Sequence, residues 1–147
     1  MSIPFETRKF LRNVAAICLN SLPIVKDPLC SSPSITKTNK GSLLLTSPET
    51  VALGLDLWRE SAQDGEPYAK IFLLLEKIAN CGEDDDSIWN EILSDILRLL
   101  SDSSFEMTNA LDHSLVGTEL LSELRKIYEF HCCISNRIPN NLNQNLQ

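Results

Sequence analysis

The chain has 147 residues, of which 43% are hydrophobic and 22% are charged, and its formal net charge is −7. This length and usage predict one domain with its own core and exclude a wholly disordered chain. The charge is uneven, because residues 1–46 carry six Lys/Arg against two Asp/Glu, whereas residues 47–147 carry seven against eighteen. The acidic body of the chain, residues 47–147, disfavours nucleic acid as a partner, since phosphates require cationic contacts. The basic N-terminal part is expected to contact an acidic partner or the chain's own body.

The sequence indicates a reducing compartment away from membranes. The first residues lack the apolar segment of a secretory signal, and no apolar run approaches the ~20 residues of a membrane-spanning helix. The five cysteines are an odd number, and Cys132 and Cys133 are adjacent, which is unlike a paired disulfide framework. We therefore expect a cytoplasmic or nuclear protein.

The first helix is expected over residues 6–20, ahead of Pro23 and Pro28. Residues 21–46 are rich in Pro, Ser, Thr and Asn and predict a long loop of the kind that is functional or mobile. Helical spacing in residues 6–20 places four apolar side chains near one face and three basic ones towards the other: Phe10, Leu11, Val14 and Ile17 against Arg8, Lys9 and Arg12.

Four further helices and a short helical piece are expected after this loop. The next helix begins with Thr46 and Glu49 at capping-box spacing, or with Ser47 as cap before Pro48, and it ends at a turn at 64–65. A helix from Pro67 to about residue 81 is apolar around most of its circumference and should be central, with Gly82 as the left-handed residue beyond its end. The remaining expected elements are an amphipathic helix over 87–101, a short piece over 105–111, a helix over 115–135 and a polar, frayed tail over 139–147.

No segment shows sustained period-two alternation, so we predict an all-α chain with a single helical domain over residues 1–138. Two architectures remain open: an irregular armadillo-like helical repeat, and a compact bundle of five to six helices.

No pattern of catalytic or metal-binding residues is present in the sequence. Glu83–Asp86 precedes a helix, where negative charge favours the positive dipole end, so this run predicts a cap and solvated turn. His131, Cys132 and Cys133 point about 100° apart on a helix and cannot share one tetrahedral site, so a metal site would need further ligands such as His113 or Cys30. Nucleophile motifs and phosphate-binding loops are also missing. We therefore expect no enzyme activity, no cofactor and no bound metal.

Two apolar helices share a pattern that resembles armadillo and HEAT repeats. Residues 10–18 (FLRNVAAIC) are similar to the start of an inner helix in the first repeat of the ataxin-ten family, and residues 71–81 resemble the corresponding helix of the next unit. Residues 120–132 supply a third such helix. The resemblance implies an intracellular scaffold that binds proteins without catalysis, with 10–20 and 71–81 lying parallel in adjacent layers. The separation of 61 residues exceeds the ~40–47 of a regular unit.

We accordingly predict a protein–protein interaction module that presents a helical surface to a partner protein or to a second copy of itself. The alternative is a helical subunit or regulator of a larger nuclear or viral assembly, with residues 21–46 as its contact arm. A small hydrolase or metal protein built around His113, His131 and Cys132 is the third alternative. Trp58 is either a core residue or an aromatic anchor for the partner. The resemblance implies that the inner-helix face binds the partner, through the polar side chains of Arg12, Asn13, Glu76, Lys77 and Asn80, and Trp58 completes the set of expected partner-binding residues.

Overall fold

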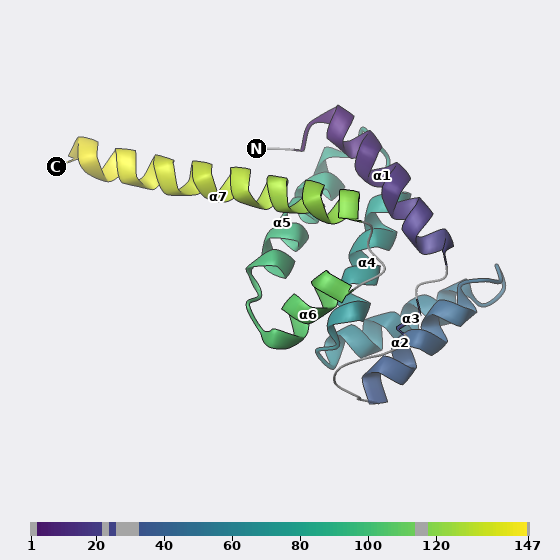
Figure 1. Ribbon diagram of the computed structural model, residues 1–147. Coiled ribbons are helices and arrows are strands. Elements are labelled where there is room, and N and C mark those ends of the chain that lie inside the picture. The colour runs from purple at the N-terminus through teal and green to yellow at the C-terminus, as the bar shows by residue number, and fades with distance from the viewer. Residues whose placement is uncertain (1–2, 22–23, 26–32, 114–117, 147) are drawn as a thin grey trace.

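The computed structural model describes residues 3–21, 24–25, 33–113 and 118–146, with the backbone alone at 33, 113, 118 and 134–146. Within these ranges every regular element is a helix and no strand occurs, which confirms the all-α class (Figure 1). The helices are α1 (Phe5–Asn20), α2 (Pro33–Leu44), α3 (Val51–Gln63), α4 (Pro67–Asn80), α5 (Asp86–Ser101), α6 (Phe105–His113) and α7 (Thr118–Leu146).

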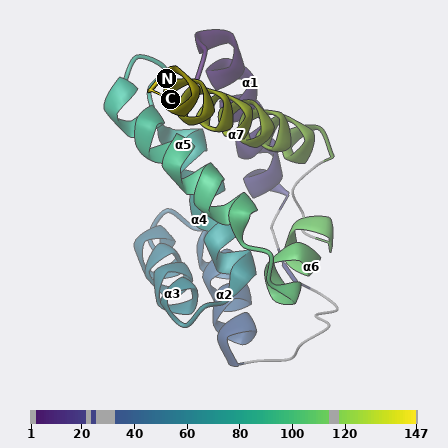
Figure 2. The same cartoon turned by 90° about the vertical axis from the view of Figure 1, so that its left-hand side faces the viewer.

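Helix α4 is the central element. It contacts α1, α2, α3, α5 and α6, and α7 lies against α1 and α5 (Figure 2). Half of its fourteen residues are buried, as its apolar composition predicts. Glu66 caps its N-terminus by accepting hydrogen bonds from the backbone N–H groups of Tyr68, at 2.7 Å, and Ala69, at 3.0 Å. The buried residues of α4 are Tyr68, Ala69, Ile71, Phe72, Leu74, Leu75 and Ile78.

Helix α1 buries a different face from the one predicted. Phe10 and Ile17 are 36% and 67% exposed, whereas Arg8 is only 2% exposed. The four buried positions of α1, at 8, 11, 15 and 18, are separated by three, four and three residues, and this spacing places them on one helical face. Arg8 is accommodated there because its guanidinium group is hydrogen-bonded within the protein. The buried residues of α1 are Arg8, Leu11, Ala15 and Cys18.

Helices α1 and α4 run antiparallel. Arg8 and Arg12, in the first half of α1, bind Glu83, which follows the end of α4. The ribbons of α1 and α4 run in opposite directions (Figure 1). The prediction that 10–20 and 71–81 lie parallel is therefore wrong. Successive inner helices of a repeat array would be parallel, so this pairing gives the armadillo resemblance no geometric support.

Helices α2 and α3 form a hairpin whose close approach depends on two glycines. A Cβ atom at Gly41 would lie 2.8 Å from the Gly54 carbonyl oxygen, and one at Gly54 would lie 2.6 Å from that of Gly41. Both residues are buried. The predicted loop over 21–46 is thus wrong for residues 33–44, which are helical and packed, and residues 26–32 lie outside the described ranges.

Several predicted helix ends are also corrected. Helix α3 begins at Val51 rather than at 46–48, and the predicted capping residue Thr46 instead donates its hydroxyl to the Leu43 carbonyl oxygen. The predicted turn at 64–65 is confirmed, with Gly65 at φ +91°, whereas Gly82 does not have a positive φ. Helix α7 continues to Leu146, so residues 139–146 are helical and do not form a separate tail.

Gly54→Ala is expected to lower the free energy of unfolding by about 1–3 kcal/mol, because the added methyl group overlaps a backbone oxygen that cannot rotate away. Urea unfolding followed by circular dichroism measures this change. Gly82→Ala is the matched control, since a Cβ atom there meets nothing within 4 Å. Equal stability of the two variants would contradict the close crossing of α2 and α3.

Candidate functional site

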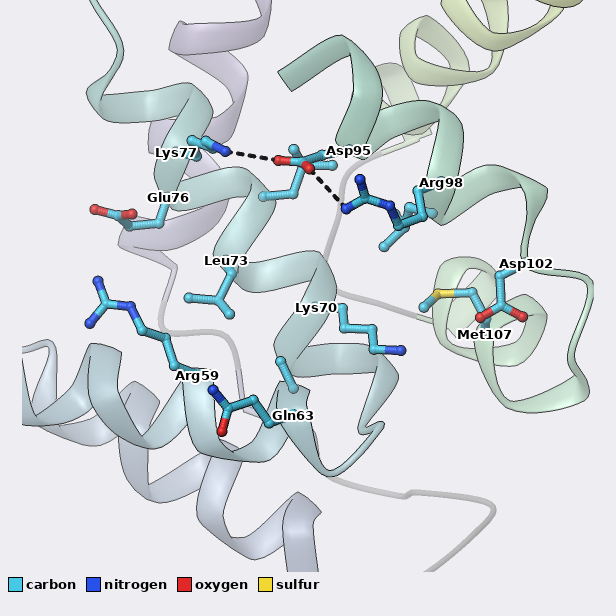
Figure 3. Close-up of a pocket in the computed structure, with 13 residues that line it drawn as sticks. Arg59, Gln63, Lys70, Leu73, Glu76, Lys77, Asp95, Arg98, Asp102 and Met107 are labelled. Carbon is cyan, nitrogen blue, oxygen red and sulfur yellow. Dashed lines mark hydrogen bonds and ion pairs between the residues drawn. The ribbon is translucent and has the colours of Figure 1, made fainter. Parts of the chain in front are cut away.

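A cleft of about 640 Å³ lies over α4 and is walled by α3, α5 and α6 (Figure 3). Its floor is apolar. Leu74, Leu99 and Met107 are buried, and Leu73 is half-buried near the centre of the cleft (Figure 3). The floor therefore offers apolar surface that a bound molecule can cover.

The rim of the cleft is charged and carries an excess of cations. Four basic and three acidic side chains line it, a net of +1 in a chain whose net charge is −7. The cleft therefore differs in sign from the protein as a whole. The charged lining residues are Arg59, Lys70, Lys77 and Arg98, with Glu76, Asp95 and Asp102.

Asp95 is the acceptor for two of these cations. Lys77 Nζ donates to Asp95 Oδ2 at 3.0 Å, and Arg98 Nη1 lies 3.4 Å from Asp95 Oδ1. Arg59 Nη1 pairs with Asp56 Oδ1 at 2.9 Å within α3. The Arg59 and Arg98 side chains are 55% and 78% exposed, so each of these pairs contributes only about 0.3–0.5 kcal/mol. Both arginines can therefore exchange their present partner for another carboxylate at small cost.

Asp102, at the end of α5, is held by the residues that follow it. The backbone N–H of Ser104 donates to Asp102 Oδ1 at 2.9 Å. This bond, a further one from the Ser104 hydroxyl and the positive charge of Lys70 together lower the pKa of Asp102. The carboxylate is consequently charged at neutral pH, and it partly balances Lys70 across the cleft (Figure 3).

The charged groups of the cleft lining are amines, guanidinium groups and carboxylates. Its described residues include no Cys, His, Ser or Tyr. Cys81 lies beyond the end of α4, where burial, and then the charge of Asp85, raise the pKa of its thiol. A protonated thiol is a poor nucleophile. The side chains that line the cleft offer apolar and ionic contacts.

No group of three or more His, Cys, Asp or Glu side chains in the described part of the chain is arranged to hold a metal ion. His131 and Cys132 are half-buried and Cys133 is exposed on α7. A hydrogen bond between the Tyr128 hydroxyl and Cys132 raises the pKa of Tyr128. Cys30 and the side chain of His113 lie outside the described residues.

The residues predicted to bind a partner fall into three groups. Glu76 and Lys77 line the cleft, and Asn80 lies one turn further along α4, where its amide donates to Glu76 Oε1 at 3.0 Å. Arg12 and Asn13 lie on α1, away from the cleft. The sixth, Trp58, is 1% exposed and belongs to the core, so it is not part of a surface that a partner can reach.

Sequence reasoning missed the cationic wall residues Arg59, Lys70 and Arg98. For Lys70 a signal was present, because Lys70 and Lys77 lie seven residues apart, on one helical face, and interrupt an otherwise apolar helix. Arg59 and Arg98 carry no such signal, since only the packing of α3 and α5 against α4 brings them to the same cleft.

The acidic run at 83–86 is an intramolecular contact as well as a helix cap. Asp85 Oδ1 accepts from the backbone N–H of Ile88 at 3.3 Å and so caps α5. Glu83 Oε1 pairs with Arg12 at 3.1 Å, and Asp86 Oδ1 pairs with Arg8 at 2.9 Å. The N-terminal basic residues Arg8 and Arg12 thus contact the chain's own acidic body.

Neither a protein-family model, nor a curated protein, nor a solved structure matches the chain. Across the described residues, no helix has both the length and the apolar character required to cross a membrane.

Proposed function

We propose that this protein is a non-catalytic interaction module that holds a segment of a partner protein in the cleft over α4. The observation that carries the proposal is the combination of an apolar floor with a charged rim, which is the usual composition of a protein interface. Leu73 is the part of the floor that stays half-exposed, so it is the natural contact for an apolar side chain of the partner.

A protein segment fits the cleft better than an enclosed small molecule does. Small-molecule sites bury about 70–90% of their ligand within concave walls. Here the walls carry Arg59 and Arg98, whose side chains are more than half exposed, so the cleft is open to solvent along its rim. An open groove between helices is typical of sites that receive a helical segment.

The cysteines support an intracellular location for this module. Cys18 and Cys81 are free and buried, and Cys132 and Cys133 are free on α7. Unpaired thiols of this number are usual in a reducing compartment. This supports our proposal of a cytoplasmic or nuclear location.

Leu73→Glu tests the proposed function. The protein is purified from the cells that express it, and its co-purifying proteins are quantified by mass spectrometry. The variant is expected to lose its specific partner by about tenfold or more, because a carboxylate replaces the apolar centre of the floor at a cost above about 1.4 kcal/mol. Circular dichroism establishes that the variant is folded.

Leu53→Glu is the matched control, since Leu53 is 59% exposed on α3 and does not line the cleft. This variant should keep the same partners as the unmodified chain. If Leu73→Glu and Leu53→Glu retain identical sets of proteins, the cleft is not the interaction surface.

A further inference from the structure

The charges of the cleft specify which kind of segment it receives. Building on the proposed function, we infer that the occupant is an acidic amphipathic helix of a partner protein. Its apolar face would cover Leu73 and the floor, and its carboxylates would bind Arg59, Lys70 and Arg98. The following steps derive each part of this assignment.

The floor favours a helix over an extended strand. It is formed by side chains of α4, α5 and α6, whose backbone groups are engaged within their own helices. An added strand would find no sheet edge to pair with, so its backbone hydrogen bonds would be unsatisfied. A helix satisfies its own backbone and presents apolar residues at i, i+3, i+4 and i+7 to such a groove.

The cations surround the apolar centre from three sides. Arg59 comes from α3, Lys70 from α4 and Arg98 from α5, and the three side chains lie around Leu73 (Figure 3). Arg59 and Arg98 are engaged only in exposed pairs with residues three positions away in their own helices. Within the described part of the chain, Lys70 has no ion pair, and Asp102 balances its charge only in part. These three charges are therefore available to flank a helix that carries Glu or Asp beside its apolar face.

The remaining surface adds selectivity for this site. A chain of net charge −7 repels an acidic segment over most of its surface and attracts it where cations gather. A basic segment would instead be drawn to many acidic positions outside the cleft. Charge complementarity thus directs an acidic helix to the cleft and disfavours binding elsewhere.

A displayed peptide library tests the inference with the intact chain. The probes are helical peptides of about 14 residues, or four turns, with fixed Leu at helical spacing and randomised flanking positions. Selection on the unmodified protein is expected to enrich Asp and Glu beside the Leu face. The triple variant R59E/K70E/R98E should enrich Lys and Arg instead, because its rim has the opposite sign.

The matched control is the triple variant K9E/K40E/K126E. It carries the same change in net charge at three exposed lysines outside the cleft, and it should still select acidic peptides. Enriched acidic peptides should bind the unmodified protein at least about tenfold more tightly than their Gln counterparts at low salt, and this ratio should fall as salt screens the charges.

Several results would overturn the inference. Enrichment of neutral or basic peptides, the same selection by both triple variants, or no enrichment at all would each do so. Displacement of a bound acidic peptide by single-stranded DNA would assign the cations to phosphate recognition instead. If neutral peptides bind the unmodified protein but not the Leu73→Glu variant, the acidic partner is rejected and the cleft remains the interaction site. If the selected peptides bind the Leu73→Glu variant as tightly as the unmodified protein, both proposals are rejected.

Discussion

Trp58→Ala is expected to lower the free energy of unfolding by about 3–5 kcal/mol, which is the usual cost of emptying a large aromatic site in a core. The Trp58 side chain is 1% exposed, and its ring lies 5.3 Å from that of Phe72. Its Nε1–H donates to the Thr38 carbonyl oxygen at 3.0 Å. Gly41 leaves the space that the indole fills, since a Cβ atom there would lie 2.7 Å from Trp58 Cδ1. Removing the ring therefore removes contacts that α3 makes with both α2 and α4.

Urea unfolding monitored by circular dichroism measures this loss, and two further variants separate its parts. Trp58→Phe keeps an aromatic ring but removes the hydrogen bond, so it should cost about 1–3 kcal/mol. Leu53→Ala, at an exposed site on the same helix, should cost less than about 0.5 kcal/mol. A folded Trp58→Phe variant should bind the selected peptides with unchanged affinity. If it loses that binding while remaining stable, Trp58 contacts the partner after all.

The polar network next to Trp58 explains why α2 was not predicted from the sequence. Thr38 Oγ1 donates to Glu66 Oε1 at 2.6 Å and lies 2.6 Å from Ser61 Oγ. Ser61 Oγ in turn donates to the Ser34 carbonyl oxygen at 2.6 Å. Thr38, Ser61 and Glu66 are all buried, yet each has hydrogen-bond partners, which removes most of the cost of burying it. Ser and Thr in a sequence usually indicate a loop, and only tertiary packing reveals that these are core residues.

The helices that periodicity predicts well are those whose buried faces are apolar. In the amphipathic helix predicted over 87–101, Trp89, Ile92 and Ile96 fall on the apolar side, and all three are 0% exposed in α5. The nearly continuous apolar surface of α4 likewise predicted its central position. Helix α1 breaks the rule because Arg8 is buried, whereas hydrophobicity assigns arginine to solvent. Its face could not be deduced without knowing that Phe5, Trp89 and Glu83 surround the guanidinium group.

Only the residues that α4 contributes to the candidate site could be predicted from the sequence. Glu76 and Lys77 were identified as polar residues on an apolar helix, and the cleft does contain them. The opposing residues belong to α3 and α5, and their distance from α4 depends on how the three helices pack. A single sequence contains no direct signal for that packing, so the cleft and its cationic character emerge only from the structure.

Arg8→Ala is expected to lower the free energy of unfolding by about 2–4 kcal/mol, since it leaves backbone acceptors unsatisfied and opens a cavity. Arg8 Nε donates to the Ile3 carbonyl oxygen at 2.7 Å, and Nη1 donates to that of Glu83 at 2.6 Å. The guanidinium carbon also lies 4.5 Å from the centroid of the Phe5 ring and 5.5 Å from that of Trp89. Asp86, its ionic partner, is 70% exposed and stays hydrated, so the expected loss is smaller than for a fully buried ion pair.

Arg12→Ala is the matched control one turn along the same helix. Its pair with Glu83 is about one-third exposed on both sides, so its loss should cost less than about 1 kcal/mol. Arg8→Lys keeps the positive charge but lacks the planar fork that reaches two carbonyl groups and stacks on the rings, so it should recover less than half of the stability lost in Arg8→Ala. Amide hydrogen exchange should show the loss of protection concentrated in α1 and the turn before α5, because Arg8 joins these two segments. If Arg8→Lys is as stable as the unmodified protein, charge alone holds α1 in place. If Arg8→Ala and Arg12→Ala lose the same stability, the buried guanidinium group of Arg8 contributes nothing special to the fold.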